Sequence, residues 1–178
     1  MASLVTHAVV AATVAAVYGV KPTTATPWLV GIACAVGPDL DVIGFWLGVP
    51  YDSFWGHRGF THSIVFAVVV SWMCAWWTGG SSVISRGRLW SLYGLAMLSH
   101  GLLDALTDGG LGVAFFSPLD ESRYFFPVRP IRVSSMSIRD VLGPHGLDVL
   151  VNEIQWVWVP CGLIAGIRWG WSRTRPIS

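Results

Sequence analysis

Residues 28–48 read WLVGIACAVGPDLDVIGFWLG, an apolar stretch whose only charged side chains are Asp39 and Asp41. A helix that crosses a lipid bilayer needs about 20 mainly apolar residues, so this stretch predicts a membrane span. Ionisable side chains within a span are costly and mark functional sites. The two aspartates therefore predict a polar site inside a membrane protein.

The rest of the chain has the same character. Of its 178 residues, 53% are hydrophobic and 12% are charged, whereas soluble domains are about 25% charged. Long stretches with few or no Asp, Glu, Lys or Arg residues predict about five transmembrane helices, roughly at residues 3–20, 28–48, 62–78, 88–107 and 149–169. A net charge of +1 leaves no basic field for nucleic acid. We therefore predict an all-α integral membrane protein with one domain over residues 1–178.

The histidine and acidic residues of these spans, together with His57 in the loop between the second and third spans, are predicted to lie at one membrane face. Consecutive spans run in opposite directions, so the start of an odd span and the end of an even span share a side. The residues concerned are His7, Asp39, Asp41, His57, His62, His100, Asp104, Asp108 and Glu153. Imidazole and carboxylate ligands suit Zn²⁺, with Mn²⁺ or Fe as alternatives. So many candidate ligands predict two or more ions, or one ion with an extensive set of supporting groups.

The spacing of these residues suggests individual roles. His100, Asp104 and Asp108 recur every four residues, which places them along one face of a helix. A metal site can lower the pKa of a bound water to about 7 and so supply hydroxide, which is hydrolytic chemistry. Asp41 is the predicted base, and Arg58 is predicted to stabilise negative charge that develops on a phosphate.

The stretch at residues 109–147 is rich in Gly, Pro, Ser and Arg, and it is a candidate lid or substrate-binding segment. Within it, Arg123, Tyr124, Arg129 and Arg132 are predicted to hold a lipid headgroup. An interfacial anchor made of arginines and aromatic residues is the alternative interpretation. Glu153 is predicted to act as a supporting acceptor behind the ligands, or as the partner of an arginine.

Several motifs closely resemble the YdjM/YbcI-like membrane-bound metal-dependent hydrolases. They are residues 38–41 (PDLD), residues 57–63 (HRGFTHS), Ser99 with His100, Asp104, Asp108, and the pairs Thr6-His7, Ser117-Pro118 and Arg123-Tyr124. The resemblance covers nearly the whole chain and implies a bacterial inner-membrane location. It also implies metal ligation by His7, Asp39, His57, His62, His100, Asp104 and Asp108, with Asp41 as a further candidate.

These observations predict a hydrolase that acts on a phosphoester or polar headgroup of a membrane lipid, the membrane being both substrate source and environment. The alternatives are a non-catalytic metal-binding membrane protein and a metal or proton transporter. A transporter would carry polar residues through the whole bilayer, whereas the other half of each span is apolar. Basic residues lie at the opposite face, namely Lys21, Arg86, Arg88, Arg168, Arg173 and Arg175. They predict that this face is cytoplasmic and that the site is periplasmic.

Overall fold

The computed structural model describes residues 1–79, 84–135 and 137–174. This part of the chain is helical and contains no strand, only isolated bridges between Thr107 and Ile131 and between Val113 and Tyr124. In chain order the helices are α1 (Leu4–Val17), α2 (Ala25–Val36), η1 (Gly37–Val42), α3 (Ile43–Trp46), η2 (Phe60–His62), α4 (Ile64–Thr78), α5 (Arg86–Ala105), α6 (Ile138–Val141), α7 (Pro144–Glu153), η3 (Ile154–Trp158) and α8 (Val159–Thr174). The all-α class predicted from the sequence is confirmed.

Each predicted span contains a helix, but the helices differ in length. The continuous segments Ala25–Trp46 and Pro144–Arg173 are long and apolar enough to cross a membrane. Helices α1 and α4 are apolar but have only 14 and 15 residues, about 21–23 Å at about 1.5 Å per residue. The hydrocarbon core of a bilayer is about 30 Å thick. Two candidate spans therefore accompany shorter apolar helices, and five crossings stay a prediction.

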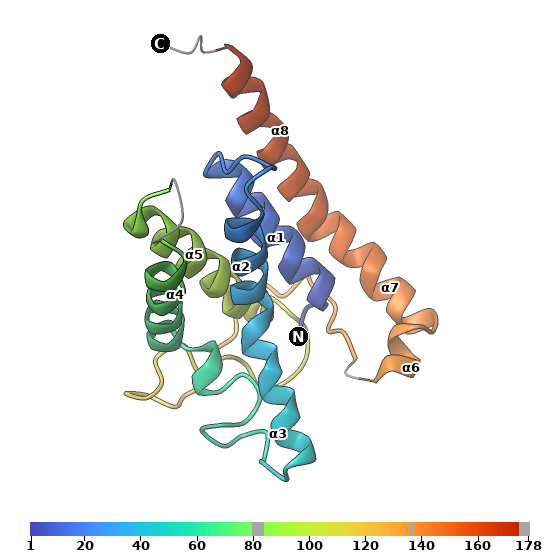
Figure 1. Cartoon of the computed structure of the whole chain (residues 1–178). Helices are drawn as coiled ribbons and strands as arrows, with labels where there is room; N and C mark the ends of the chain where they lie inside the picture. Colours follow the sequence, from blue (N-terminus) through green and yellow to red (C-terminus); the bar gives the residue numbers. More distant parts are fainter. Residues whose placement is uncertain (80–83, 136, 175–178) are drawn as a thin grey trace.

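Helix α5 is the centre of the bundle, since it contacts α1, α2 and α4 (Figure 1). The long α7–α8 segment runs along the outside of α1. Small side chains allow close approach between helices, as is usual in membrane bundles. On α4, the buried residues Ala67, Ser71 and Ala75 recur every four residues. A Cβ added to Gly94 of α5 would lie 3.3 Å from Ser71 Oγ, so α4 and α5 pack closely there.

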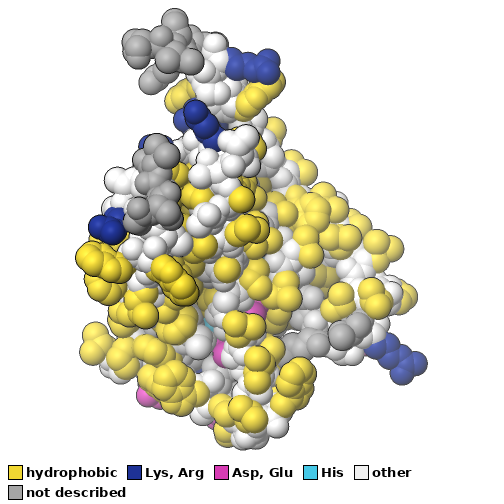
Figure 2. Space-filling view, in the orientation of Figure 1, with side chains coloured by type: hydrophobic (Ala, Val, Ile, Leu, Met, Phe, Trp, Pro, Cys, Tyr) yellow, Lys and Arg dark blue, Asp and Glu magenta, His cyan; other side chains and the backbone are white. Residues whose placement is uncertain are grey.

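The outer surface of the bundle is apolar. Large apolar side chains exposed on α4 and α8 include Val65, Val69, Trp72, Met73, Trp76, Trp77, Leu163, Ile164, Ile167 and Trp169. Figure 2 shows apolar side chains over most of this face, while most of the visible Lys and Arg side chains lie towards the end of the molecule where α8 ends. A continuous apolar surface of this kind fits contact with lipid.

The segment that the sequence assigned to a loop at residues 109–147 is partly helical. It contains α6, and α7 already begins at Pro144 because proline is favoured in the first turn of a helix. The preceding part folds back onto the end of α5. There Phe126 N donates to Ala105 O at 3.0 Å, and Asp108 N donates to Ile131 O at 2.9 Å. The loop is thus attached to the helix that carries His100 and Asp104.

Candidate metal centre

Four buried side chains meet at one end of the bundle. Asp39 lies just after α2, His62 lies just before α4, and His100 and Asp104 lie near the end of α5. One ligand atom of each of the four lies within 4.8 Å of the others. His100 and Asp104 are one helical turn apart and so share a face of α5. Because the helices alternate in direction, these chain segments all reach the same end of the bundle.

The distances within this group suit one metal ion. His100 Nε2 lies 3.0 Å from His62 Nε2 and 3.3 Å from Asp39 Oδ1. Asp104 Oδ2 lies 3.7 Å from His62 Nε2 and 4.0 Å from His100 Nε2. Four ligands at about 2.1 Å from a tetrahedral ion lie about 3.4 Å from one another. The observed separations bracket that value, so the four atoms fit around a single ion.

The two imidazoles of the group are oriented by acceptors behind them. His100 Nδ1 donates to Ala35 O at 2.6 Å, which leaves Nε2 as the atom that faces the other ligands. His62 Nδ1 lies 3.2 Å from Asp41 Oδ2, and its Nε2 likewise points into the group. Metal-bound histidines usually donate their other ring nitrogen to a carboxylate or carbonyl in this way.

Polar atoms without hydrogen-bond partners surround the group. In the described part of the chain, the buried side-chain atoms of this kind are His7 Nδ1, His7 Nε2, Asp39 Oδ1, Asp39 Oδ2 and His57 Nε2. The His7 ring stacks on His100 with 3.8 Å between centroids, and His7 Nε2 lies 3.7 Å from Asp104 Oδ1. Each unsatisfied buried polar group costs about 1–3 kcal/mol. A divalent cation bound by Asp39 would satisfy its carboxylate and would lie close to His7, so the donor set fits a metal.

Asp41 and His57 lie beside this group. Asp41 Oδ1 accepts from His57 Nδ1 at 2.7 Å, while Asp41 Oδ2 accepts from Thr61 Oγ1 at 2.7 Å and from Arg58 N at 3.2 Å. Asp41, His57 and His62 form a second group with the composition of a metal site. The short hydrogen bonds show that both Asp41 oxygens are already occupied by donors. Burial lowers the pKa of His57, which favours the neutral form of its ring.

Arg58 is fully buried and holds Asp104 in place. Its Nε donates to Asp104 Oδ2 at 3.0 Å, its Nη1 to Gly109 O at 2.8 Å, and its Nη2 to Thr107 Oγ1 at 2.9 Å. The residue has a φ of 64°, a left-handed conformation that is rare outside glycine. Arg58 therefore neutralises a ligand and connects it to the loop after α5.

Asp108 and Glu153 lie apart from the four-residue group. Helix α5 ends at Ala105, so Asp108 does not continue the helical row; it is exposed, and its Oδ1 accepts from Val133 N at 2.8 Å. Glu153 is buried and accepts from Ser3 N, Ser3 Oγ and Thr6 Oγ1 at 2.5, 2.6 and 2.8 Å. Its partners in the described part of the chain are thus Ser3 and Thr6, at the start of α1 and next to His7, and none of them is an arginine.

The loop residues predicted to bind substrate have separate positions. Arg123 donates to the carbonyls of His57, Tyr51 and Ser53, and so braces the segment that carries His57. The Tyr124 hydroxyl donates to Asp120 Oδ2 at 2.6 Å. Arg129 lies 4.7 Å above the Phe125 ring, and the exposed Arg132 lies 3.5 Å from Asp148. None of the four side chains belongs to the buried His and Asp group.

The comparisons with known proteins agree with the motifs. The sequence profile described as YdjM inner membrane protein matches residues 1–175. The chain belongs to the YdjM family. It is 37% identical over 178 residues to the inner membrane protein YbcI of Escherichia coli (strain K12), in an alignment that covers 97% of this chain and 99% of YbcI. No solved structure matches the chain. The predicted family is confirmed, and it is a family of inner membrane proteins.

In this YdjM-family chain, the residues that sequence reasoning missed are those that support the ligands. Thr61 lies between the two histidines of HRGFTHS and bonds Asp41, and its place inside the motif is a usable signal. Thr107 accepts from Arg58 and donates to Asp104 O at 2.7 Å. The carbonyl of Ala35 has no side-chain signal at all, because any residue offers the same group.

Proposed function

We propose that this YdjM-family protein is a metal-dependent hydrolase that cleaves a phosphoester or a related headgroup bond of a membrane lipid. The observation that carries the proposal is the buried group of Asp39, His62, His100 and Asp104, surrounded by polar atoms without partners. A membrane protein retains such a costly arrangement for a function. The apolar surface around it makes lipid the most accessible substrate.

Asp39, His62, His100 and Asp104 would hold the ion, with His7 as a further donor beside them. Imidazole and carboxylate ligands without thiolates favour Zn²⁺, with Mn²⁺ or Fe as alternatives. Bound there, a divalent ion supplies Lewis acidity towards a phosphoryl oxygen and hydroxide at neutral pH. The four ligands hold one ion, so a second ion would need ligands of its own, and His7 or His57 would have to be among them.

The protein's own groups then orient the ligands and move a proton. Asp41 holds the proton on His57 Nδ1, which leaves the buried His57 Nε2 without a partner and able to accept a proton. We assign to Asp41 and His57 together the base that the sequence assigned to Asp41 alone. A water then attacks the phosphorus and gives a proton to His57 Nε2. The bond from phosphorus to the ester oxygen breaks, and the leaving oxygen takes that proton back from His57 Nε2. Arg58, already bound to Asp104, keeps that carboxylate in position.

The proposal is tested by purifying the protein in detergent, measuring its metal content and assaying a panel of lipid phosphoesters. We expect metal-dependent turnover in the native protein and its loss in His62→Ala and Asp104→Asn. Matched controls are His145→Ala and Asp148→Asn, the same substitutions at exposed positions of α7. Metal without turnover of any lipid would instead support a non-catalytic metal-binding protein, and no metal would refute the proposal.

We also propose that the site faces the periplasm. Most basic side chains visible in Figure 2 lie towards the end of the molecule opposite the site. Cytoplasmic ends of membrane proteins carry the excess of Lys and Arg. Arg175, which belongs to the basic residues predicted from the sequence, lies outside the described residues. Leu119→Cys on the site side and Ser172→Cys near the end of α8 test this with a membrane-impermeant maleimide. Labelling of Leu119→Cys in intact cells, with Ser172→Cys labelled only after lysis, is the expected result. The reverse pattern would contradict it.

A further inference from the structure

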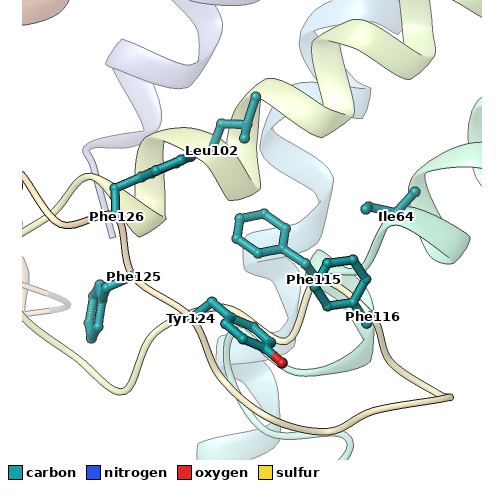
Figure 3. A pocket seen from close by; sticks show the side chains of 7 residues that line it. All are labelled: Ile64, Leu102, Phe115, Phe116, Tyr124, Phe125 and Phe126. Carbon is teal, nitrogen blue, oxygen red and sulfur yellow. The ribbon is translucent and has the colours of Figure 1, made fainter.

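We infer that a pocket beside the metal centre binds an acyl chain of a membrane lipid, an inference that rests on the proposed function. The pocket has a volume of about 310 Å³ and is lined by Ile64, Leu102, Phe115, Phe116, Tyr124, Phe125 and Phe126. A volume near 300 Å³ lies at the lower end of the range of ligand pockets. Figure 3 shows Phe126 reaching towards Leu102, with Phe115 and Phe116 between Tyr124 and Ile64.

The walls of the pocket are continuous with the ligand-bearing segments. Ile64 follows His62 by two positions at the start of α4, and Leu102 lies midway between His100 and Asp104 on α5. The loop joins this wall through Ile64 N, which donates to Phe115 O at 3.0 Å.

Little more than one layer of backbone separates the pocket from the ligands. A Cβ added to Gly101 would lie 3.2 Å from both the Phe115 ring and His62 O. A chain seated in the pocket is therefore held directly beside the metal centre.

The chemistry of the lining selects an acyl chain. The lining is aromatic or aliphatic, and the only polar side-chain atom in it, the Tyr124 hydroxyl, is bound to Asp120. Its outer residues remain exposed, with Ile64 at 40%, Leu102 at 46% and Phe116 at 52%. In a family of inner membrane proteins, an apolar opening between exposed helix faces meets lipid chains and not water.

A cation at the edge of the pocket complements the other end of such a lipid. The Arg129 guanidinium lies 4.7 Å above the ring of Phe125, and it forms no ion pair within the described part of the chain. The Asp120 carboxylate accepts hydrogen bonds from the Tyr124 hydroxyl and from Ser122 N. An anionic headgroup suits this edge, because arginine binds phosphate oxygens through paired donors.

The experiment uses the full-length protein in nanodiscs that contain phosphatidylglycerol with a photoactivatable diazirine in one acyl chain. After irradiation, mass spectrometry maps the labelled residues. We expect labelling concentrated on Ile64, Leu102 and residues 115–126. In Leu102→Trp the larger indole occupies part of the pocket and displaces part of the acyl chain. Labelling of residues 115–126 should then fall roughly tenfold, which corresponds to about two CH₂ groups of the chain that are no longer buried.

Leu95→Trp is the matched control. Leu95 lies seven residues earlier on the same face of α5, is 47% exposed against 46% for Leu102, and lines a neighbouring pocket of about 320 Å³. Labelling of residues 115–126 should be unchanged in this variant. An equal fall in both variants, labelling spread evenly along α4 and α5, or crosslinks to another protein would each overturn the inference.

Two further measurements separate this inference from the proposed function. Metal content of Leu102→Trp equal to that of the native protein shows that the centre is intact, so reduced labelling reports the pocket alone. Labelling requires no turnover. Concentrated labelling in a protein that hydrolyses no lipid would therefore support the pocket and refute the hydrolase.

Discussion

Replacing Asp41 with asparagine should weaken metal binding although every proposed ligand remains. His57 Nδ1 donates to one oxygen of Asp41, and Thr61 Oγ1 and Arg58 N donate to the other. Asparagine has a single oxygen, so its NH₂ group must face at least one of these donors. A lost hydrogen bond to a charged acceptor costs about 1.5–3 kcal/mol, or roughly 10- to 150-fold in affinity. Changes to supporting groups of metal ligands have effects of about 10- to 100-fold.

Competition with a chromophoric zinc chelator in detergent measures this affinity. The control is Asp108→Asn, the same change at an exposed aspartate that the sequence placed among the ligands. Its affinity should stay within about twofold of the native value, as for most surface substitutions. Unchanged affinity in Asp41→Asn, or an equal loss in Asp108→Asn, would refute the reasoning. Loss of a whole equivalent of metal in Asp41→Asn would show that Asp41 is itself a ligand.

Other predictions concern stability. Arg58→Lys keeps the charge but loses the planar fork that serves three acceptors, so the free energy of unfolding should fall by about 2–4 kcal/mol in an SDS titration. Glu153→Ala leaves donors of Ser3 and Thr6 buried without an acceptor and should cost about 3–5 kcal/mol, whereas Glu121→Ala at an exposed site should be neutral in the same titration. Removing the metal with a chelator should lower the thermal midpoint of the native protein. Zinc at a hundredfold excess over its Kd should then restore about 2.7 kcal/mol of the free energy of unfolding. A midpoint that chelators leave unchanged would count against a bound ion.

The positions of the helices were predictable because charge is excluded from them. The uncharged stretch from Leu89 to Leu103 forms most of α5, which runs from Arg86 to Ala105. The start of α7 was missed because the composition of residues 109–147 favours a loop, whereas Pro144 begins a helix. Hydropathy alone cannot decide which helices cross the bilayer, since α1 and α4 are apolar yet short for its hydrocarbon core.

The site was predictable where ligands share a helix and unpredictable where the backbone turns. A four-residue spacing correctly places His100 beside Asp104. The same rule extended to Asp108 does not hold, because α5 ends at Ala105 and the Thr107 hydroxyl turns back to bond Asp104 O. The contacts of Arg58 depend on its positive φ and on the loop at Gly109, neither of which has a local sequence signal.

The most direct test of the central claim is elemental analysis of the purified native protein beside His100→Ala and its matched control His145→Ala. We expect at least one Zn, Mn or Fe ion per chain in the native protein and in His145→Ala, and a marked loss of metal in His100→Ala. Both proteins are incubated with these metals and passed through gel filtration before the measurement. If the native protein then holds no more divalent metal than His100→Ala, the proposed metal centre is contradicted.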